Sequence, residues 1–285
     1  MPSIVGMLVV ILCVFGGYAL EHGNFSVILQ PVEWLIIFGA AGGALLIANP
    51  MSVIKSLFQQ AIKCLTKPGV YTKEDFLDLL LLLNDIFRKI KKEGLISIEQ
   101  DIENPEASKI ISSFPKILAN HVALDFIRDT FRSILTTNIS HFELEALLEN
   151  EIEIIHHEAA EPAHRLSILA DSMPGLGLVA AVLGIILTMG KIDEPPAVLA
   201  HHLSIAIAGT FFGILTCYGF MAPLSARMER MANEEKEYLM VIKQAIVSFI
   251  AGGAPQMAVE FARRTIPPHL RPSFTELEAK LKERR

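Results

Sequence analysis

The side chains best suited to acid–base or metal chemistry gather in one part of the chain. Seven glutamates and no lysine or arginine lie between Glu143 and Glu161, together with His156, His157 and, just beyond, His164. Their spacing matches no strong zinc motif, and the chain shows no nucleophile–base or phosphate-loop signature. We therefore predict a protein that is not an enzyme and needs no metal or cofactor. The acidic stretch is interpreted as either a solvated helix face or a surface for a partner.

The composition indicates a membrane protein. Of 285 residues, 52% are hydrophobic and only 20% are charged, and the mean hydropathy is +0.44. The net charge of −6 argues against a nucleic-acid binder. A helix needs about 20 apolar residues to cross a bilayer, and four blocks approach or exceed that length: 1–20, 34–54, 173–189 and 199–224. A cleaved signal peptide is the alternative for the first block, but no lysine or arginine precedes Lys55.

Lysine and arginine counts predict the orientation of these spans. Residues 55–171 hold 13 and the tail after Leu224 holds 11, whereas the other two loops share only Lys191. By the positive-inside rule, both termini and the middle segment are cytoplasmic. We predict four segments: two peripheral transmembrane helices in 1–54, a cytoplasmic domain in 55–171, two inner transmembrane helices in 172–224 and a cytoplasmic tail in 225–285.

The cytoplasmic segments are predicted to be helical. Residues 74–92 form a broad apolar face opposite charged residues, and Gly94 is suited to end that helix. Two capping boxes are predicted, one at Ser97 with Gln100 and one at Ser140 with Glu143. Because no alternating β-type runs compete, the predicted fold class is an all-α membrane protein.

The predicted spans lack an ionisable group in their interior. Glu33 and Asp171 are placed at helix edges, so an ion path would need a carboxylate from a second protein. Small residues are frequent in the third and fourth spans and permit close helix contact, whereas the first two spans are bulkier and are expected to face lipid. Pro174 and Pro223 lie at the cytoplasmic ends of the inner spans, as helix punctuation or as a pair of hinges.

Several stretches resemble the flagellar motor stator family MotA. Residues 171–184, DSMPGLGLVAAVLG, and 209–223, GTFFGILTCYGFMAP, are similar to its third and fourth transmembrane helices. Residues 97–105, 259–265 and 271–278 are similar to its cytoplasmic parts. The related TolQ and ExbB proteins share the inner two helices but have three spans, so the fourth span argues against them. A proton-driven energiser of an envelope protein is nevertheless the alternative function.

The resemblance implies a proton channel of the bacterial inner membrane that drives rotation. A ring of such chains, five in the family, surrounds a MotB-like partner that supplies the ion-binding aspartate. Pro174 and Pro223 are then the coupling prolines, and the channel-lining residues are expected to be Ala181, Thr210, Tyr218 and Asp171. Ala181 stands where sodium-type members tend to have threonine, which favours H⁺ over Na⁺.

The resemblance also implies a charged surface for the rotor protein FliG. Its acidic member matches Glu99. Its basic member, usually arginine in the family, matches Lys91, with Arg88 and Lys92 close by. Lysine keeps the charge but lacks the planar fork of arginine.

Overall fold

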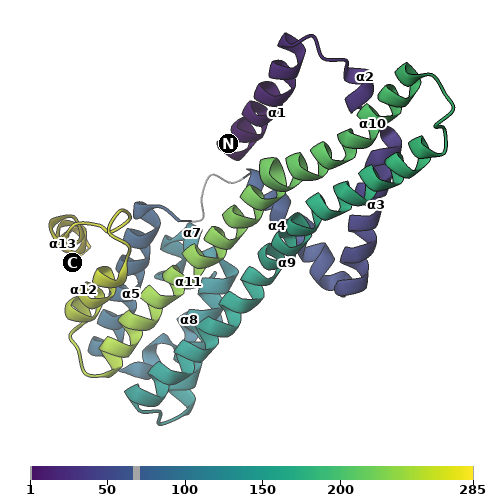
Figure 1. The fold of residues 1–285 in the computed structure, drawn as a ribbon. Helices are drawn as coiled ribbons and strands as arrows, with labels where there is room; N and C mark the ends of the chain where they lie inside the picture. The colour runs from purple at the N-terminus through teal and green to yellow at the C-terminus, as the bar shows by residue number, and fades with distance from the viewer. Residues whose placement is uncertain (1, 67–70, 285) are drawn as a thin grey trace. The chain divides into compact units, whose positions relative to one another are not determined.

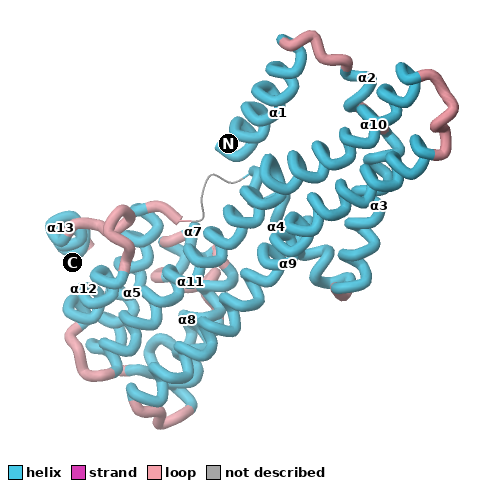
Figure 2. Tube along the Cα trace, viewed as in Figure 1, coloured by secondary structure: helices cyan, strands magenta, loops and turns pink. Residues whose placement is uncertain are grey.

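The structure is a computed structural model that describes residues 2–66 and 71–284, and every regular element within those ranges is helical (Figures 1 and 2). The predicted all-α class is therefore confirmed. Residues 1, 67–70 and 285, which belong to the predicted first span, cytoplasmic domain and tail, lie outside the described residues.

Four helical stretches are long and apolar enough to cross a membrane, as predicted. The first is α1, Pro2–Leu20, and the second comprises α2, Phe25–Ile28, and α3, Pro31–Ala48. The third lies in α9, His141–Met189, and the fourth begins with α10, Pro196–Ile214.

The second span ends earlier than the predicted residue 54. Asn49 has an extended backbone, and α4, Met51–Thr66, begins directly after Pro50. Proline disfavours helical geometry in the residue before it and is well suited to the start of a new helix. The break therefore follows from Pro50.

The chain divides into two compact units. The span unit comprises residues 1–68 and 159–231, and the head unit comprises residues 69–158 and 232–285. Both α9 and α11, Ala222–Ile250, contribute to each unit. The units are thus discontinuous in sequence, unlike the four consecutive segments drawn from hydropathy.

The span unit has two small apolar cores. In one, Ile37 and Ala41 of α3 pack with Ala180 of α9 and Phe212 of α10. In the other, α4 contributes Leu57 and Cys64 against α9 and α11. The apolar window of α1 has no buried residue within the isolated chain, so its outer surface is available to lipid or to other subunits.

The head unit has the larger core. It is built from α5, Lys73–Glu93, and from α8, His121–Thr136, together with parts of α9 and α11 and with α12, Pro255–Thr265. Thr72 and Asp75 form a capping box that begins α5, and Gly94 ends it with φ of 87°. The rings of Tyr71 and Tyr238 stack with centroids 4.0 Å apart.

One of the two predicted capping boxes is present. Ser140 and Glu143 cap the start of α9 reciprocally. The prediction of a capping box at Ser97 and Gln100 is wrong, because the turn at Gly94 leads first into a 3₁₀ helix, Leu95–Ile98. The Ser97 hydroxyl donates to the Gly94 carbonyl at 2.6 Å, and α6, Glu99–Glu103, begins without a side-chain cap.

Candidate functional site

In the span unit, α9 and α10 run side by side (Figure 1) and approach closely at glycines. A Cβ atom at Gly213 would lie 2.5 Å from the Met173 carbonyl oxygen, and one at Gly177 would lie 2.7 Å from the Gly209 carbonyl oxygen. Both distances are shorter than any van der Waals contact. Only glycine fits at these positions, and the two backbones touch.

The four predicted channel-lining residues differ in exposure. Ala181 is buried, and Thr210 is half-buried. Tyr218 and Asp171 are exposed in the isolated chain. Ala181 and Thr210 directly follow Ala180 and Gly209, which meet at the α9–α10 contact. The exposed Tyr218 and Asp171 are accessible to other molecules.

Neither predicted coupling proline ends a helix. Pro174 lies inside α9, which continues as a helix for 49 residues. Pro223 is the second residue of α11 and follows a π-helical segment, Leu215–Met221. A proline ring clashes with the carbonyl four residues earlier and removes one hydrogen bond, and the wider π turn accommodates both effects. Each proline thus weakens a helix that passes on into the head unit.

Glu33 lies in the first turn of α3, near the helix edge where it was predicted, but within the second candidate span, Phe25–Ala48. Its burial was not predicted: the side chain is 6% exposed. Its Oε2 atom has no hydrogen-bond partner among the described residues. The signal that reveals this placement is Pro31, since proline favours the first helical position and starts the helix before Glu33.

On the head unit, three predicted rotor-facing residues converge. Arg88, Lys91 and Lys92 line a groove whose remaining walls are Asp85, Lys89, Pro255 and Arg284. We call this surface the basic groove. Glu99 is exposed at the start of α6 and is not part of the groove lining. Five of the seven lining residues are cationic, so the groove favours an acidic partner.

Sequence reasoning missed Lys89 and Arg284. The Lys89 ammonium donates to Asp101 at 2.6 Å and thereby ties the last turn of α5 to α6, which carries Glu99. The Arg284 guanidinium donates to Asp85 at 2.8 Å and lies 4.5 Å from the centroid of the Phe114 ring. Arg284 is 199 residues from Asp85, so no local pattern links the two.

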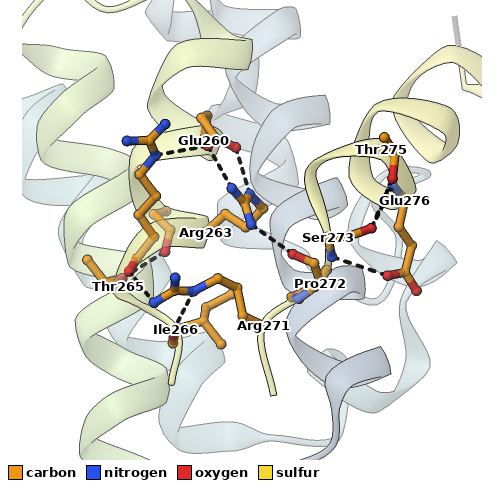
Figure 3. Close-up of polar contacts among 11 residues, drawn as sticks. Glu260, Arg263, Thr265, Ile266, Arg271, Pro272, Ser273, Thr275 and Glu276 are labelled. Carbon is orange, nitrogen blue, oxygen red and sulfur yellow. Dashed lines mark hydrogen bonds and ion pairs between the residues drawn. The ribbon is translucent and has the colours of Figure 1, made fainter. Parts of the chain in front are cut away.

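A network of arginines folds the tail that carries Arg284 (Figure 3). The Arg263 guanidinium donates two bonds to the Glu260 carboxylate, at 2.7 and 2.8 Å, and one to the Pro272 carbonyl at 2.9 Å. Hydrogen bonding from Arg263 lowers the pKa of Glu260 below its ordinary value. Arg271 bonds the Ile266 carbonyl at 2.9 Å, and Ser273 caps α13, Phe274–Glu283. The network fixes the direction in which α13 leaves α12.

The acidic stretch between Glu143 and Glu161 is partly paired. Glu149 and Glu153 accept hydrogen bonds from Lys243 and Lys236 of α11, and Glu161 pairs with Arg165 at 3.1 Å. Hydrogen bonding from Lys236 lowers the pKa of Glu153. The stretch is therefore in part a helix-pairing surface rather than a wholly solvated one. Within residues 2–66 and 71–284, no three histidine, cysteine or acidic side chains gather as a metal site would require.

These features define a four-span α-helical membrane protein with a second, more polar helical unit. Residues 4–94 match the family described as Motility protein A N-terminal, and residues 119–240 match the MotA/TolQ/ExbB proton channel family. Motility protein A of Salmonella typhimurium is 42% identical to this chain, covering 98% of it and 94% of the relative. The Escherichia coli protein of that name is 41% identical over the same shares. The chain belongs to the Motility protein A family, and the resemblance predicted from its motifs is confirmed.

Solved structures share the fold. The chain superimposes on a subunit of Campylobacter jejuni MotAB with a TM-score of 0.78 at 20% identity, covering 96% of this chain and 98% of that one. A subunit of the flagellar MotAB stator complex from Bacillus subtilis gives a TM-score of 0.77 at 21% identity, covering 97% and 100%. The fold of this chain is thus a known one.

Proposed function

We propose that this chain is a stator subunit of the bacterial flagellar motor. With a MotB-like partner it forms a proton channel of the inner membrane and couples ion flow to torque on the rotor. Both termini and the segment 55–171 are cytoplasmic in this proposal, and several copies, five in keeping with the family, form a ring around the partner. The chain acts as a channel and motor component and not as an enzyme.

The observation that carries the proposal is the continuity of two helices. In the span unit, α9 and α10 touch at glycines. In α9 the contact is preceded along the chain by Pro174 and by the head-unit residues of the same helix. In α10 it is followed by the π-helical segment, by Pro223 and by the head-unit residues of α11. When a partner carboxylate that contacts these helices gains or loses a proton, a resulting movement of the helices can pass along their backbones to the head unit. Pro174 and Pro223 are the proposed hinges.

The proposed ion is H⁺. Ala181 offers no oxygen to a partly dehydrated cation, while a proton needs only a carboxylate and a water path. Thr210 supplies one hydroxyl near the α9–α10 contact. No resident cofactor is part of the proposal.

The proposed rotor contact is electrostatic. Lys91 and Lys92 are exposed, Arg88 is half-buried beside them, and Glu99 is exposed on α6. Such charges steer encounter and orientation more than they add affinity. The contact partner in the proposal is the rotor protein FliG.

The test is complementation of a Salmonella typhimurium strain that lacks its own Motility protein A. The chain is expressed with its MotB-like partner, tagged for co-purification. We expect swimming to be restored and the two proteins to purify together from membranes. Co-purification without swimming would instead favour the alternative, an energiser of an envelope protein, although the match of residues 4–94 to the Motility protein A N-terminal family speaks against it.

A further inference from the structure

Glu33 is a buried acid that the proposed mechanism leaves unused. It lies in the first turn of α3, within the span unit, and is 6% exposed. None of the ion pairs found among the described residues involves it, and its Oε2 atom lacks a hydrogen-bond partner there. A charged carboxylate in such a place is unfavourable unless it binds a cation or a proton.

The carboxyl group points into the α9–α10 contact. A Cβ atom at Gly209 would lie 2.8 Å from Glu33 Oε2, and one at Gly184 would lie 3.8 Å from Glu33 Oε1. The Ala180 Cβ atom lies 3.1 Å from the Cβ position at Gly209, and the Ala206 Cβ atom lies 2.7 Å from the Cβ position at Gly184. We call the space lined by Ala180, Gly184, Ala206 and Gly209 the notch. The notch exists because all four positions carry hydrogen or methyl groups only.

The notch adjoins the residues proposed to line the channel. Gly184 is one helical turn beyond Ala181 on α9, and Gly209 directly precedes Thr210 on α10. Gly184 is also ten residues past Pro174, which is about 15 Å along a helix. In the proposed topology, Glu33 therefore lies on the exterior side of the coupling prolines.

We infer that Glu33 is a proton-binding site of this chain, positioned to receive a proton from the exterior side and release it toward the partner's carboxylate. The inference rests on the proposed function. Ionisable side chains inside a membrane segment commonly mark an ion path. In each cycle a proton binds to a Glu33 carboxylate oxygen and leaves it again through water, so no bond of the chain changes.

The first measurement is chemical and does not depend on motor activity. Dicyclohexylcarbodiimide, which reacts with protonated carboxyl groups in apolar surroundings, is added to membranes containing the full complex, and modified residues are located by peptide mass spectrometry. We expect modification at Glu33 and none at Glu21, an exposed acid in the neighbouring turn. The variant Glu33→Gln should lose the modification. An unmodified Glu33 in the wild-type complex would overturn the inference.

The second measurement is proton flux and swimming speed of the variants. Glu33→Gln keeps the shape of the side chain and should lose most of the flux, and Glu33→Asp should restore part of it, while the control Glu21→Gln matches the wild type. Normal flux in Glu33→Gln, at normal assembly, would refute the proton site and leave the stator proposal intact. A wild-type complex that carries no flux, yet is modified at Glu33, would contradict the stator proposal instead.

Discussion

Lys91 and Lys92 end α5 with exposed side chains, on the rim of the basic groove. Exposed ion pairs contribute only about 0–1 kcal/mol each, so the proposed rotor contact depends on the summed charge of the groove. Since Arg88, Lys89 and Arg284 also line it, no single neutralisation removes the field. Charge reversal is the informative change.

We predict that Lys91→Glu impairs swimming more than Lys91→Arg, because only the first change reverses the charge. The double variant Lys91→Glu with Lys92→Glu should be much worse than either single one. Swimming speed at equal protein level is the measurement. Normal motility of the double variant would place the rotor contact elsewhere on the head unit.

Glu260 makes the stability of the head unit depend on pH. Because Arg263 lowers its pKa in the folded state, the ion pair stabilises the protein above the ordinary glutamate value of about 4.3, and that contribution disappears as pH falls through the lowered pKa. Glu260→Gln should therefore lower the free energy of unfolding at pH 7 by about 1.5–3 kcal/mol. Thermal unfolding followed by circular dichroism should show the difference shrinking in acid.

The matched control is Glu278→Gln. Glu278 pairs with Lys282 on an exposed face of α13, so its removal should change stability by about 0.5 kcal/mol or less. Equal losses in the two variants would show that the Glu260 pair is no more than a surface ion pair.

The residue scale is also where sequence reasoning fell short. Lys91 and Glu99 were found because the family resemblance implies a charged pair at these positions. The burial of Glu33 was not predicted, because whether an acid near a span end is buried depends on which helix packs over it. Arg284 was missed because its partner Asp85 is distant in sequence.

At the scale of elements, the glycine contact between α9 and α10 is a tight steric constraint. Gly213→Ala would place a methyl group 2.5 Å from the Met173 carbonyl oxygen, so one backbone must move. Overpacking of this kind costs about 1–3 kcal/mol. We expect weaker assembly with the partner and a lower melting temperature. Gly175→Ala is the control, since among the described residues no atom outside the adjoining residues and the local helix backbone lies within 4 Å of its new methyl group. Equal behaviour of the two variants would contradict the account.

The two prolines make the second prediction at this scale. Pro174→Ala or Pro223→Ala should leave insertion and assembly intact and abolish or severely reduce motility, because alanine restores the helix that proline weakens. Membrane level, co-purification and swimming are measured together. Wild-type swimming in both variants would mean that the prolines affect only the local helix geometry and not the coupling.

The membrane-spanning and amphipathic helices could be predicted from the sequence, because hydrophobic blocks and amphipathic faces are local features. The residues at which helices begin and end were predicted less accurately. The second span ends at Ala48 because Pro50 interrupts the helix, and α4 begins at Met51. The π-helical segment Leu215–Met221 has no local signature apart from the proline that follows it.

At the scale of the whole molecule, the four-span order could be predicted, whereas the assembly of each unit from two distant stretches could not. Hydropathy divides a chain into consecutive segments. The core of the head unit instead forms only when residues 232–285 pack on residues 69–158. The stacked rings of Tyr71 and Tyr238 are one of the contacts between these two stretches. Contacts between such distant residues leave no periodic trace.

The central claim is that this chain forms a proton path only together with a partner carboxylate. It is tested most directly by reconstituting the chain in liposomes, alone and with its MotB-like partner, and following internal pH under an imposed gradient. The account predicts no proton flux from the chain alone, flux from the pair, and loss of flux when the partner's membrane aspartate is changed to asparagine. Flux from the chain alone equal to that of the pair would contradict it.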